Sequence, residues 1–87
     1  MREKVTDKPD YYLDITRDLC PMTFVKTKLL VERMQPGQVC EIRLQGAEPL
    51  INVPRSIATL GHLVVDLGLE TGEPEHGVHR IRIIKVL

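Results

Sequence analysis

Hydrophobic and polar residues alternate in short stretches that predict the strands of a sheet. In YYLDI (residues 11–15) the hydrophobic residues stand two apart, and VCEIRL (39–44) repeats this period. A period of two is typical of a half-buried strand. Two later stretches, LVVDLGLE (63–70) and HRIRIIKVL (79–87), are separated by the turn-forming segment TGEPEHG and are predicted as the third and fourth strands.

Two helices are predicted between these strands. The first runs from about residue 21 to 34 and ends at QPGQ, because Pro36 and Gly37 cannot continue it. Its apolar face has helical spacing and consists of Phe24, Thr27, Leu30, Val31 and Met34. A second apolar patch on the same helix, formed by Met22, Val25 and Leu29, favours contact with a partner. The second helix is predicted to carry Pro54 in its first turn and to end near Gly61, with QGAEP (45–49) as a loop before it.

The resulting element order is βαβαββ. A strand–helix–strand unit predicts that the first two strands are parallel with a right-handed crossover, and the turn-like link predicts that the last two are antiparallel. We therefore expect an α+β protein with one four-stranded mixed sheet and both helices on one face. The length of 87 residues suits a flexible N-terminal segment (1–10) followed by a single domain (11–87).

Composition and charge exclude several classes of function. Lys and Arg number 12, as do Asp and Glu, so there is no basic excess for nucleic-acid binding, and aromatic residues are few. No apolar run approaches the roughly 20 residues that cross a bilayer, and the charged N-terminus does not resemble a signal peptide. The cytoplasm is therefore the expected compartment, where the two cysteines are expected to be free thiols.

Cys20 is the strongest candidate for chemistry. Pro21 suits the first position of a helix, which would make Cys20 the N-cap, next to the unpaired N–H groups of the first turn. The positive end of the helix dipole favours a thiolate there, and Arg17 would add a nearby cation. Cysteine is not a preferred capping residue, which favours a reactive thiol. A plain helix cap stays open as the alternative.

The segment LDITRDLCPMTFVKTKLLVERMQPGQ resembles the TusA-like (SirA-like) family of sulfur carriers. The family pattern has a Leu-Asp strand, a Cys-Pro-x-Pro motif at the start of the first helix and a Met-x-Pro-Gly turn at its end. The matching residues are Leu13, Asp14, Cys20, Pro21, Met34, Pro36 and Gly37. The later segment EPLINVP (48–54) is similar to the acidic-Pro stretch that leads into the family's second helix.

This resemblance implies a two-layer α/β sandwich that carries sulfur between proteins. Cys20 would hold the sulfur as a persulfide, and Pro21 would present it. The implied partners are a sulfur-donor protein, such as a cysteine desulfurase or a rhodanese-like protein, and an acceptor protein, for example in tRNA thiolation or sulfur metabolism. No cofactor, metal, membrane or direct nucleic-acid contact is implied, and the chain would be sulfurtransferase-like if active.

The sequence departs from the family pattern at Thr23, which replaces the second proline. Threonine restores a backbone N–H and adds a hydroxyl, two groups that are able to bond Cys20 and thereby tune its thiol. The departure also keeps a second hypothesis open, a non-catalytic interaction or regulatory module in which Cys20 only caps the helix. RNA binding is disfavoured by the zero net charge.

The first helix also predicts a surface for partners. Lys26, Lys28 and Arg33 make it locally basic, which fits either a solvated face or docking of an acidic partner. The residues predicted to contact a partner beside Cys20 are Met22, Val25 and Lys26.

The remaining candidates favour structural roles. Cys40 lies in mid-strand and is predicted to be buried and inert, with a resolving partnership to Cys20 as the alternative. His62, His76 and His79 are predicted as solvated loop residues because a zinc site needs more ligands. The acidic residues form no paired-carboxylate spacing; they are Asp14, Asp18, Glu48 and Asp66. Asp14 and Asp18 flank the Cys20 segment and would oppose thiolate formation unless Arg17 offsets them.

Overall fold

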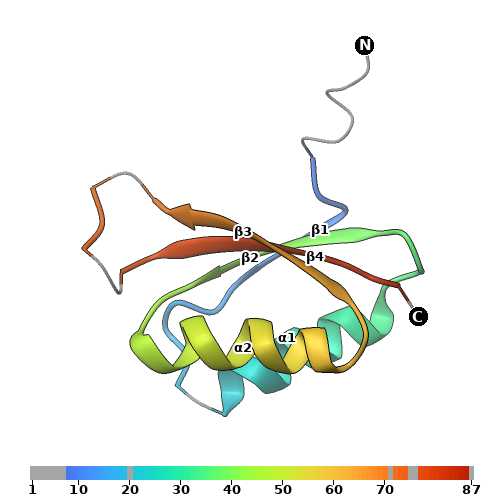
Figure 1. Cartoon of the computed structure of the whole chain (residues 1–87), viewed down its shortest axis with the longest axis horizontal. Coiled ribbons are helices and arrows are strands. Elements are labelled where there is room, and N and C mark those ends of the chain that lie inside the picture. Colours follow the sequence, from blue (N-terminus) through green and yellow to red (C-terminus); the bar gives the residue numbers. More distant parts are fainter. Residues whose placement is uncertain (1–7, 20, 71, 75–76, 87) are drawn as a thin grey trace.

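The computed structural model describes residues 8–19, 21–70, 72–74 and 77–86. Over these residues the elements are β1 (Tyr11–Asp14), α1 (Met22–Arg33), β2 (Val39–Leu44), α2 (Ala47–Thr59), β3 (Leu63–Leu69) and β4 (His79–Ile84). Figure 1 shows the sheet as one layer and the two helices together as the other. The predicted βαβαββ order and the two-layer sandwich are confirmed.

The strands of the described residues follow the order β1-β2-β4-β3 in the sheet. β1 and β2 are parallel, with Tyr11 opposite Cys40, and β4 lies antiparallel to both β2 and β3. These directions match the prediction. The insertion of the last strand between β2 and β3 makes β1 and β3 the edges of the sheet.

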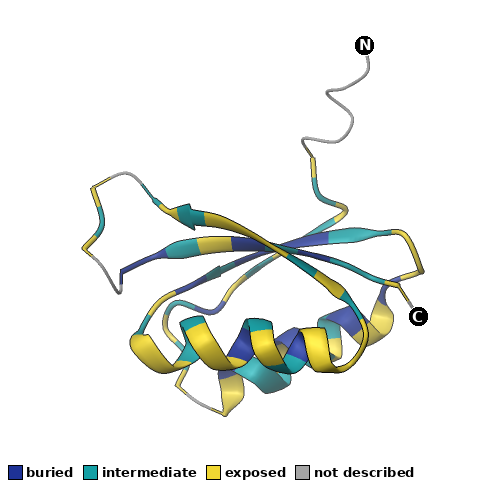
Figure 2. Ribbon diagram, viewed as in Figure 1, coloured by how far each residue is buried: buried dark blue, intermediate teal, exposed yellow. Residues whose placement is uncertain are grey.

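The hydrophobic core lies between the sheet and the helices, where the buried residues of Figure 2 are concentrated. The alternation in β2 buries Cys40, Ile42 and Leu44 completely against the helix layer. The other buried members of this cluster are Ile15, Val31, Met34, Val53, Ile57, Ile81 and Ile83. Removing these side chains from water supplies the main driving force for folding.

The opposite face of the sheet, called the open face here, is not covered by α1 or α2. Glu41 is only 5% exposed there and accepts hydrogen bonds from Arg80 and Arg82, each at 3.0 Å. Arg43 pairs with Glu70 at 2.8 Å and with Asp14 at 3.0 Å. Charged residues at alternate strand positions thus form an ion-pair network across the sheet.

Neither α1 nor α2, the helices of the described residues, combines the length and the apolar character needed to cross a bilayer.

The first helix was placed correctly to within one residue, but its cap was not. The structure assigns the cap position to Pro21, so the prediction that Cys20 is the N-cap is wrong by one residue. Pro21 has φ −91° and ψ 5°, outside the helical geometry that a first-turn residue needs.

The second helix starts earlier than predicted. It begins at Ala47, so the last three residues of QGAEP are helical and do not form a loop. Gly46, with φ 102°, makes the turn that allows this start, a conformation that residues with a Cβ rarely adopt. Pro49 then occupies the first turn, where its missing N–H costs no helical bond, and Pro54 lies inside the helix. The assignment of Pro54 to the first turn was therefore wrong.

Candidate functional site

The segment that contains Cys20 joins β1 to α1, at the end of the sheet where the parallel strands β1 and β2 finish. The connections that follow these strands, β1–α1 and β2–α2, are held together by hydrogen bonds. Ile15 donates its N–H to the Arg43 carbonyl at 2.9 Å, and Gln45 Nε2 donates to the Thr16 carbonyl at 2.9 Å. Cys20 itself lies outside the described residues, but the connection that leads to it is held beside the β2–α2 connection by these two bonds.

A hollow of about 350 Å³ lies between these two connections. It is lined by Thr16, Asp18 and Leu19 from the first connection and by Gln45, Gly46, Glu48 and Pro49 from the second. Crevices at the carboxyl ends of parallel strands are common ligand sites in α/β proteins. The hollow therefore lies beside Asp18 and Leu19, the described residues that precede Cys20.

The first turn of α1 is closed by backbone groups. The Leu19 carbonyl accepts from Met22 N–H at 2.7 Å and from Thr23 N–H at 3.3 Å, and the Pro21 carbonyl accepts from Val25 N–H at 3.0 Å. These bonds fix residues 19 and 21–25 relative to the helix. Leu19 is 82% exposed and Met22 is 46% exposed, so apolar side chains reach solvent on both sides of position 20.

Thr23, predicted to shape the site, is 1% exposed and lies on the buried side of α1. Its backbone N–H is used by the Leu19 carbonyl, and its own carbonyl accepts from the Thr27 hydroxyl at 2.8 Å. The N–H that threonine restores thus helps close the first turn. Cys20 lies outside the described residues, so a bond between it and the Thr23 hydroxyl stays a prediction.

The charges near the site are largely compensated. Lys26, one of the predicted partner-binding residues, pairs with Asp18 at 2.8 Å. Asp14 accepts from both the N–H and the hydroxyl of Thr16, and these bonds, with a smaller contribution from Arg43, hold the pKa of its carboxyl below the ordinary value. Arg17 is exposed and forms no ion pair with another described residue. Among the described residues, Asp18 therefore has an ionic partner and Arg17 has none.

The predicted contact surface is only partly exposed. Met22 and Lys26 face solvent, whereas Val25 is half-buried. Leu19 and Leu29 are more exposed than Val25, and Leu29 belongs to the second apolar patch seen in the sequence. Leu19 was missed because a single leucine in a connection has no periodic pattern to mark it.

Cys40 is a free, fully buried thiol in β2. Burial raises the pKa of this thiol from 9.0 to about 11. The prediction of a buried cysteine is confirmed, and at neutral pH the group is a thiol.

His62 and His79 are less exposed than predicted. His79 is not in a loop: it opens β4, is half-buried and donates from Nδ1 to the Gly77 carbonyl at 3.1 Å. His62 Nδ1 accepts from Val86 N–H at 3.1 Å, and His76 lies outside the described residues. Among the residues that the structure describes, no group of three or more His, Cys, Asp or Glu side chains is arranged to hold a metal ion.

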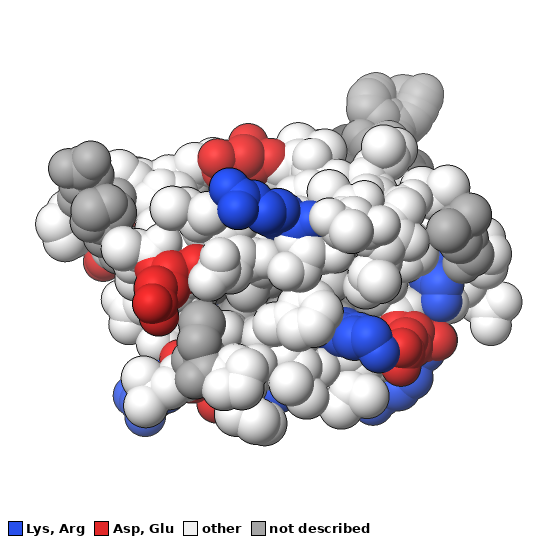
Figure 3. Space-filling model, turned by 60° about the horizontal axis from the view of Figure 1, so that its bottom comes forward, with Lys and Arg blue, Asp and Glu red and all other residues white. Residues whose placement is uncertain are grey.

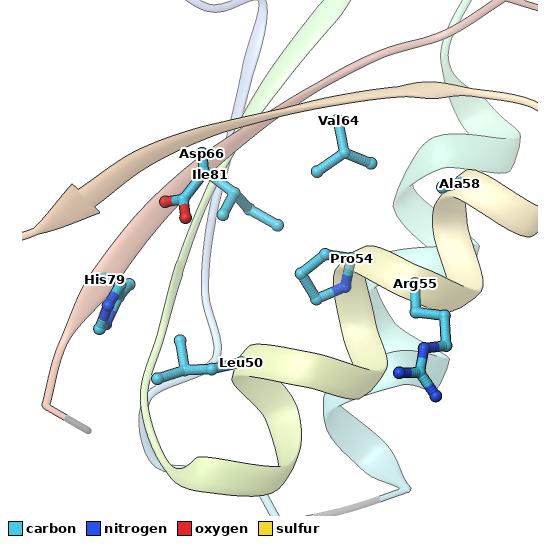
Figure 4. A pocket seen from close by; sticks show the side chains of 8 residues that line it. All are labelled: Leu50, Pro54, Arg55, Ala58, Val64, Asp66, His79 and Ile81. Carbon is cyan, nitrogen blue, oxygen red and sulfur yellow. The ribbon is translucent and has the colours of Figure 1, made fainter. Parts of the chain in front are cut away.

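A second hollow, of about 430 Å³, lies between α2 and the strands β3 and β4 (Figure 4). Leu50 and Pro54 of α2 face Val64 and Ile81 of the sheet, and Asp66 and His79 add polar atoms at one end. The residues of the β1–α1 connection do not line it, so it is distinct from the candidate site.

Acidic and basic side chains lie interspersed among uncharged residues on the molecular face in Figure 3. No extended basic surface is visible on that face, which agrees with the balanced charge of the sequence.

The fold, with its cysteine segment at the start of α1, corresponds to a known family. Residues 11–85 match the family model described as sulfurtransferase TusA. The chain therefore belongs to the TusA family, and the resemblance found in the sequence is confirmed.

Individual relatives agree with this assignment. A candidate sulfur carrier protein of Archaeoglobus fulgidus is 35% identical over 66 residues, covering 76% of this chain and 74% of that protein. Another, of Thermotoga maritima, is 28% identical over 67 residues, covering 77% of this chain and 84% of its own. The crystal structure of a SirA-like protein from Desulfitobacterium hafniense superimposes with a TM-score of 0.68 and 18% identity, covering 88% of this chain and 99% of that one, which shows the shared fold.

Proposed function

We propose that this protein is a sulfur carrier that accepts sulfane sulfur as a persulfide on Cys20 and passes it to the thiol of an acceptor protein. Family membership supports a sulfur-carrier role. The observation that carries the finer proposal is the exposure of Leu19 and Met22 on either side of Cys20, at the amino end of α1. A residue that exchanges sulfur with other proteins has to be reached by them, and apolar neighbours favour such contacts.

The proposed transfer is a pair of thiol–persulfide exchanges. The Cys20 thiolate attacks the terminal sulfur of a donor persulfide, forming a new S–S bond while the donor S–S bond breaks and the donor leaves as a thiolate. An acceptor thiolate then attacks the terminal sulfur on Cys20 and releases the Cys20 thiolate. No external oxidant or reductant is consumed, and the amino end of α1 favours the anionic forms of Cys20.

The proposed donor is a cysteine desulfurase or a rhodanese-like protein, and the acceptor is a protein of tRNA thiolation or sulfur metabolism in the cytoplasm. Met22, Val25 and Lys26 are proposed to contact these partners, together with Leu19. The hollow between the β1–α1 and β2–α2 connections would admit a partner side chain next to the transferring sulfur.

The test is the intact mass of reduced protein after incubation with a cysteine desulfurase plus cysteine and, separately, with inorganic polysulfide. We expect a gain of one sulfur atom that a thiol reductant reverses. The gain should be absent in Cys20→Ser and present in Cys40→Ser. An unchanged wild-type mass with both sources, or equal labelling of Cys40, would refute the carrier function.

Thr23 favours one alternative, an interaction module without sulfur transfer. Its N–H closes the first turn through the Leu19 carbonyl, and in this alternative Cys20 has only a structural role at the start of α1. In that case alkylation of Cys20 at neutral pH would be no faster than that of free cysteine, whereas a carrier thiol at a helix amino end should react faster.

A further inference from the structure

A groove of about 360 Å³ lies between β1, at one edge of the sheet, and α1, and is called the β1–α1 groove here. Its lining includes Tyr12 and Leu13 from β1 and Lys26, Leu29 and Arg33 from α1. It shares no lining residue with the hollow beside the Cys20 segment or with the hollow between α2 and the sheet. The β1–α1 groove is therefore a separate feature of the surface.

Apolar and aromatic side chains are exposed in the β1–α1 groove. Leu29 is 54% exposed and Tyr12 is 56% exposed, although both belong to regular elements of the fold. Leu13, which also lines the groove, is half-buried. Large apolar side chains exposed next to one another mark surfaces that other proteins contact.

The charged residues that line the β1–α1 groove are both basic, in a chain whose formal net charge is zero. Arg33 is exposed and forms no ion pair with another described residue. It is not required at the end of α1, because Lys85 Nζ already donates to the carbonyls of Val31 and Glu32 at 2.9 and 3.3 Å. Arg33 is thus available to an anionic group from outside.

Lys26, the second cation of the groove, is paired with Asp18 at 2.8 Å. The two side chains are 45% and 22% exposed, and ion pairs this open to water contribute little to stability. Asp18 itself does not line the groove. Lys26 can therefore accept a second carboxylate from the groove side.

The backbone of β1 offers hydrogen bonds along the same edge. In the described part of the chain, β1 pairs only with β2, and the Ile15 N–H bonds the Arg43 carbonyl on that side at 2.9 Å. The N–H groups of successive strand residues point alternately to the two sides. Tyr12 and Asp14 therefore direct their N–H groups outward, where an extended segment can pair with them.

We propose that the β1–α1 groove binds an extended acidic segment of a partner protein, which adds a strand to β1. Alternate side chains of the added strand point to the helix side. Acidic side chains there meet Arg33 and Lys26, and an apolar side chain meets Leu29. Main-chain bonds at Tyr12 and Asp14 supply affinity, and the side chains supply specificity.

The acidic residue of β1 does not oppose such a partner. Asp14 lies on the open face, where its carboxylate accepts from the Thr16 hydroxyl at 2.7 Å and pairs with Arg43 at 3.0 Å. It does not line the β1–α1 groove. The cations of the groove are thus separated from this carboxylate by the strand itself.

Through Lys26 the β1–α1 groove continues the surface proposed above for sulfur-transfer partners. The inference does not rest on sulfur transfer, because its test measures binding of a peptide and involves no reaction of Cys20. Loss of sulfur loading and loss of peptide binding are therefore separate results.

The first arm of the test is an NMR titration of the isotope-labelled full chain with two short blocked peptides. In both peptides threonine alternates with leucine and charged residues, which are glutamates in one peptide and lysines in the other. We expect the glutamate peptide to bind at least about tenfold more tightly at low salt and to shift the amide signals of residues 26–33. Equal binding of the two peptides, or no binding of the glutamate peptide, would overturn the proposal.

Arg33→Glu should weaken binding of the glutamate peptide by at least about fivefold, and Arg33→Gln by a smaller factor. Arg55→Glu is the matched control, because Arg55 is exposed on α2, pairs with no acidic group of the described residues and does not line the groove. It should bind within about twofold of wild type. Equal losses in Arg33→Glu and Arg55→Glu would contradict a site at the groove. Thermal unfolding verifies that each variant is folded.

The second arm tests strand addition by amide hydrogen exchange with the glutamate peptide at saturation. The N–H groups of Tyr12 and Asp14 should exchange at least about tenfold more slowly than in the free chain, because they become hydrogen-bonded. The amides of β3, at the other edge of the sheet, are the internal control and should not change. Binding that leaves the exchange of Tyr12 unchanged would show that the segment does not extend the sheet, which refutes the proposal.

Discussion

Thr23 shows how one substitution in a family pattern can be absorbed by local structure. A proline there has no N–H, and the threonine places its N–H on the Leu19 carbonyl at 3.3 Å. The side chain lies on the buried face of α1, in line with Thr27 and Val31, at positions that recur every four residues. The helical spacing placed Thr27 and Val31 on this face, but it did not identify Thr23, because a polar residue at the end of the helix does not extend a hydrophobic pattern.

We expect the buried thiol of Cys40 to be far less reactive than the thiol of Cys20. Burial raises the pKa of Cys40 by about two units, from 9.0 to about 11, so its thiolate fraction at pH 8 falls about a hundredfold. In a Cys20→Ser variant we expect iodoacetamide at pH 8 to label Cys40 at least about a hundredfold faster in urea than in the folded protein. Equal labelling rates with and without urea would contradict the burial of Cys40 and would complicate the assignment of any persulfide to Cys20.

At the scale of elements, the two prolines of α2 differ in whether they remove a hydrogen bond from the helix. Pro49 stands in the first turn, where the backbone N–H has no helical acceptor. Pro54 stands in the interior, where the Leu50 carbonyl would accept a bond that proline cannot donate. The ring of Pro54 also lines the hollow between α2 and the sheet.

Pro54→Ala is therefore expected to raise the free energy of unfolding by about 1 kcal/mol, since a restored helical bond outweighs the lost packing of the ring. Pro49→Ala is the matched control and should change the free energy of unfolding by less than about 0.5 kcal/mol. Urea denaturation at neutral pH measures both. A loss of stability in Pro54→Ala would mean that packing of the ring dominates.

The sequence predicts the strands and the first helix well because their side chains repeat with clear periods. The early start of α2 was missed because Pro49 reads as a helix breaker unless Gly46 is known to make the preceding turn. The site was predicted through the residues around Cys20. The residues that line the hollow from the β2–α2 connection, Gln45 and Glu48 among them, were missed. Their position beside the Cys20 segment depends on how β1 and β2 pair, and residue spacing does not encode this pairing.

At the scale of the whole molecule, the open face links strands that are distant in sequence. Arg43 of β2 joins Asp14 at the end of β1 to Glu70, which follows β3, and Arg80 of β4 lies 3.5 Å from the same Glu70 carboxylate. The bond from Arg43 holds the pKa of Glu70 below its ordinary value, and that of Asp14 is lowered by Thr16 and then by Arg43. Because of these lowered pKa values, the stability of the folded protein depends on pH.

A carboxylate with a lowered pKa in the folded state contributes stability above its unfolded pKa, and this contribution is lost as the pH falls through the folded value. Arg43→Gln should let the pKa of Glu70 return toward its ordinary value, and that of Asp14 in part, since Thr16 still binds Asp14. We therefore expect Arg43→Gln to lower the melting temperature at neutral pH but to lose less on further acidification than wild type does. Thermal unfolding from about pH 7 to pH 3 measures this difference.

Arg55→Gln is the control, because Arg55 is exposed and pairs with no acidic group of the described residues, so its acid profile should parallel that of wild type. If Arg43→Gln also parallels wild type, the ion pairs on the open face contribute nothing to the acid sensitivity of the fold.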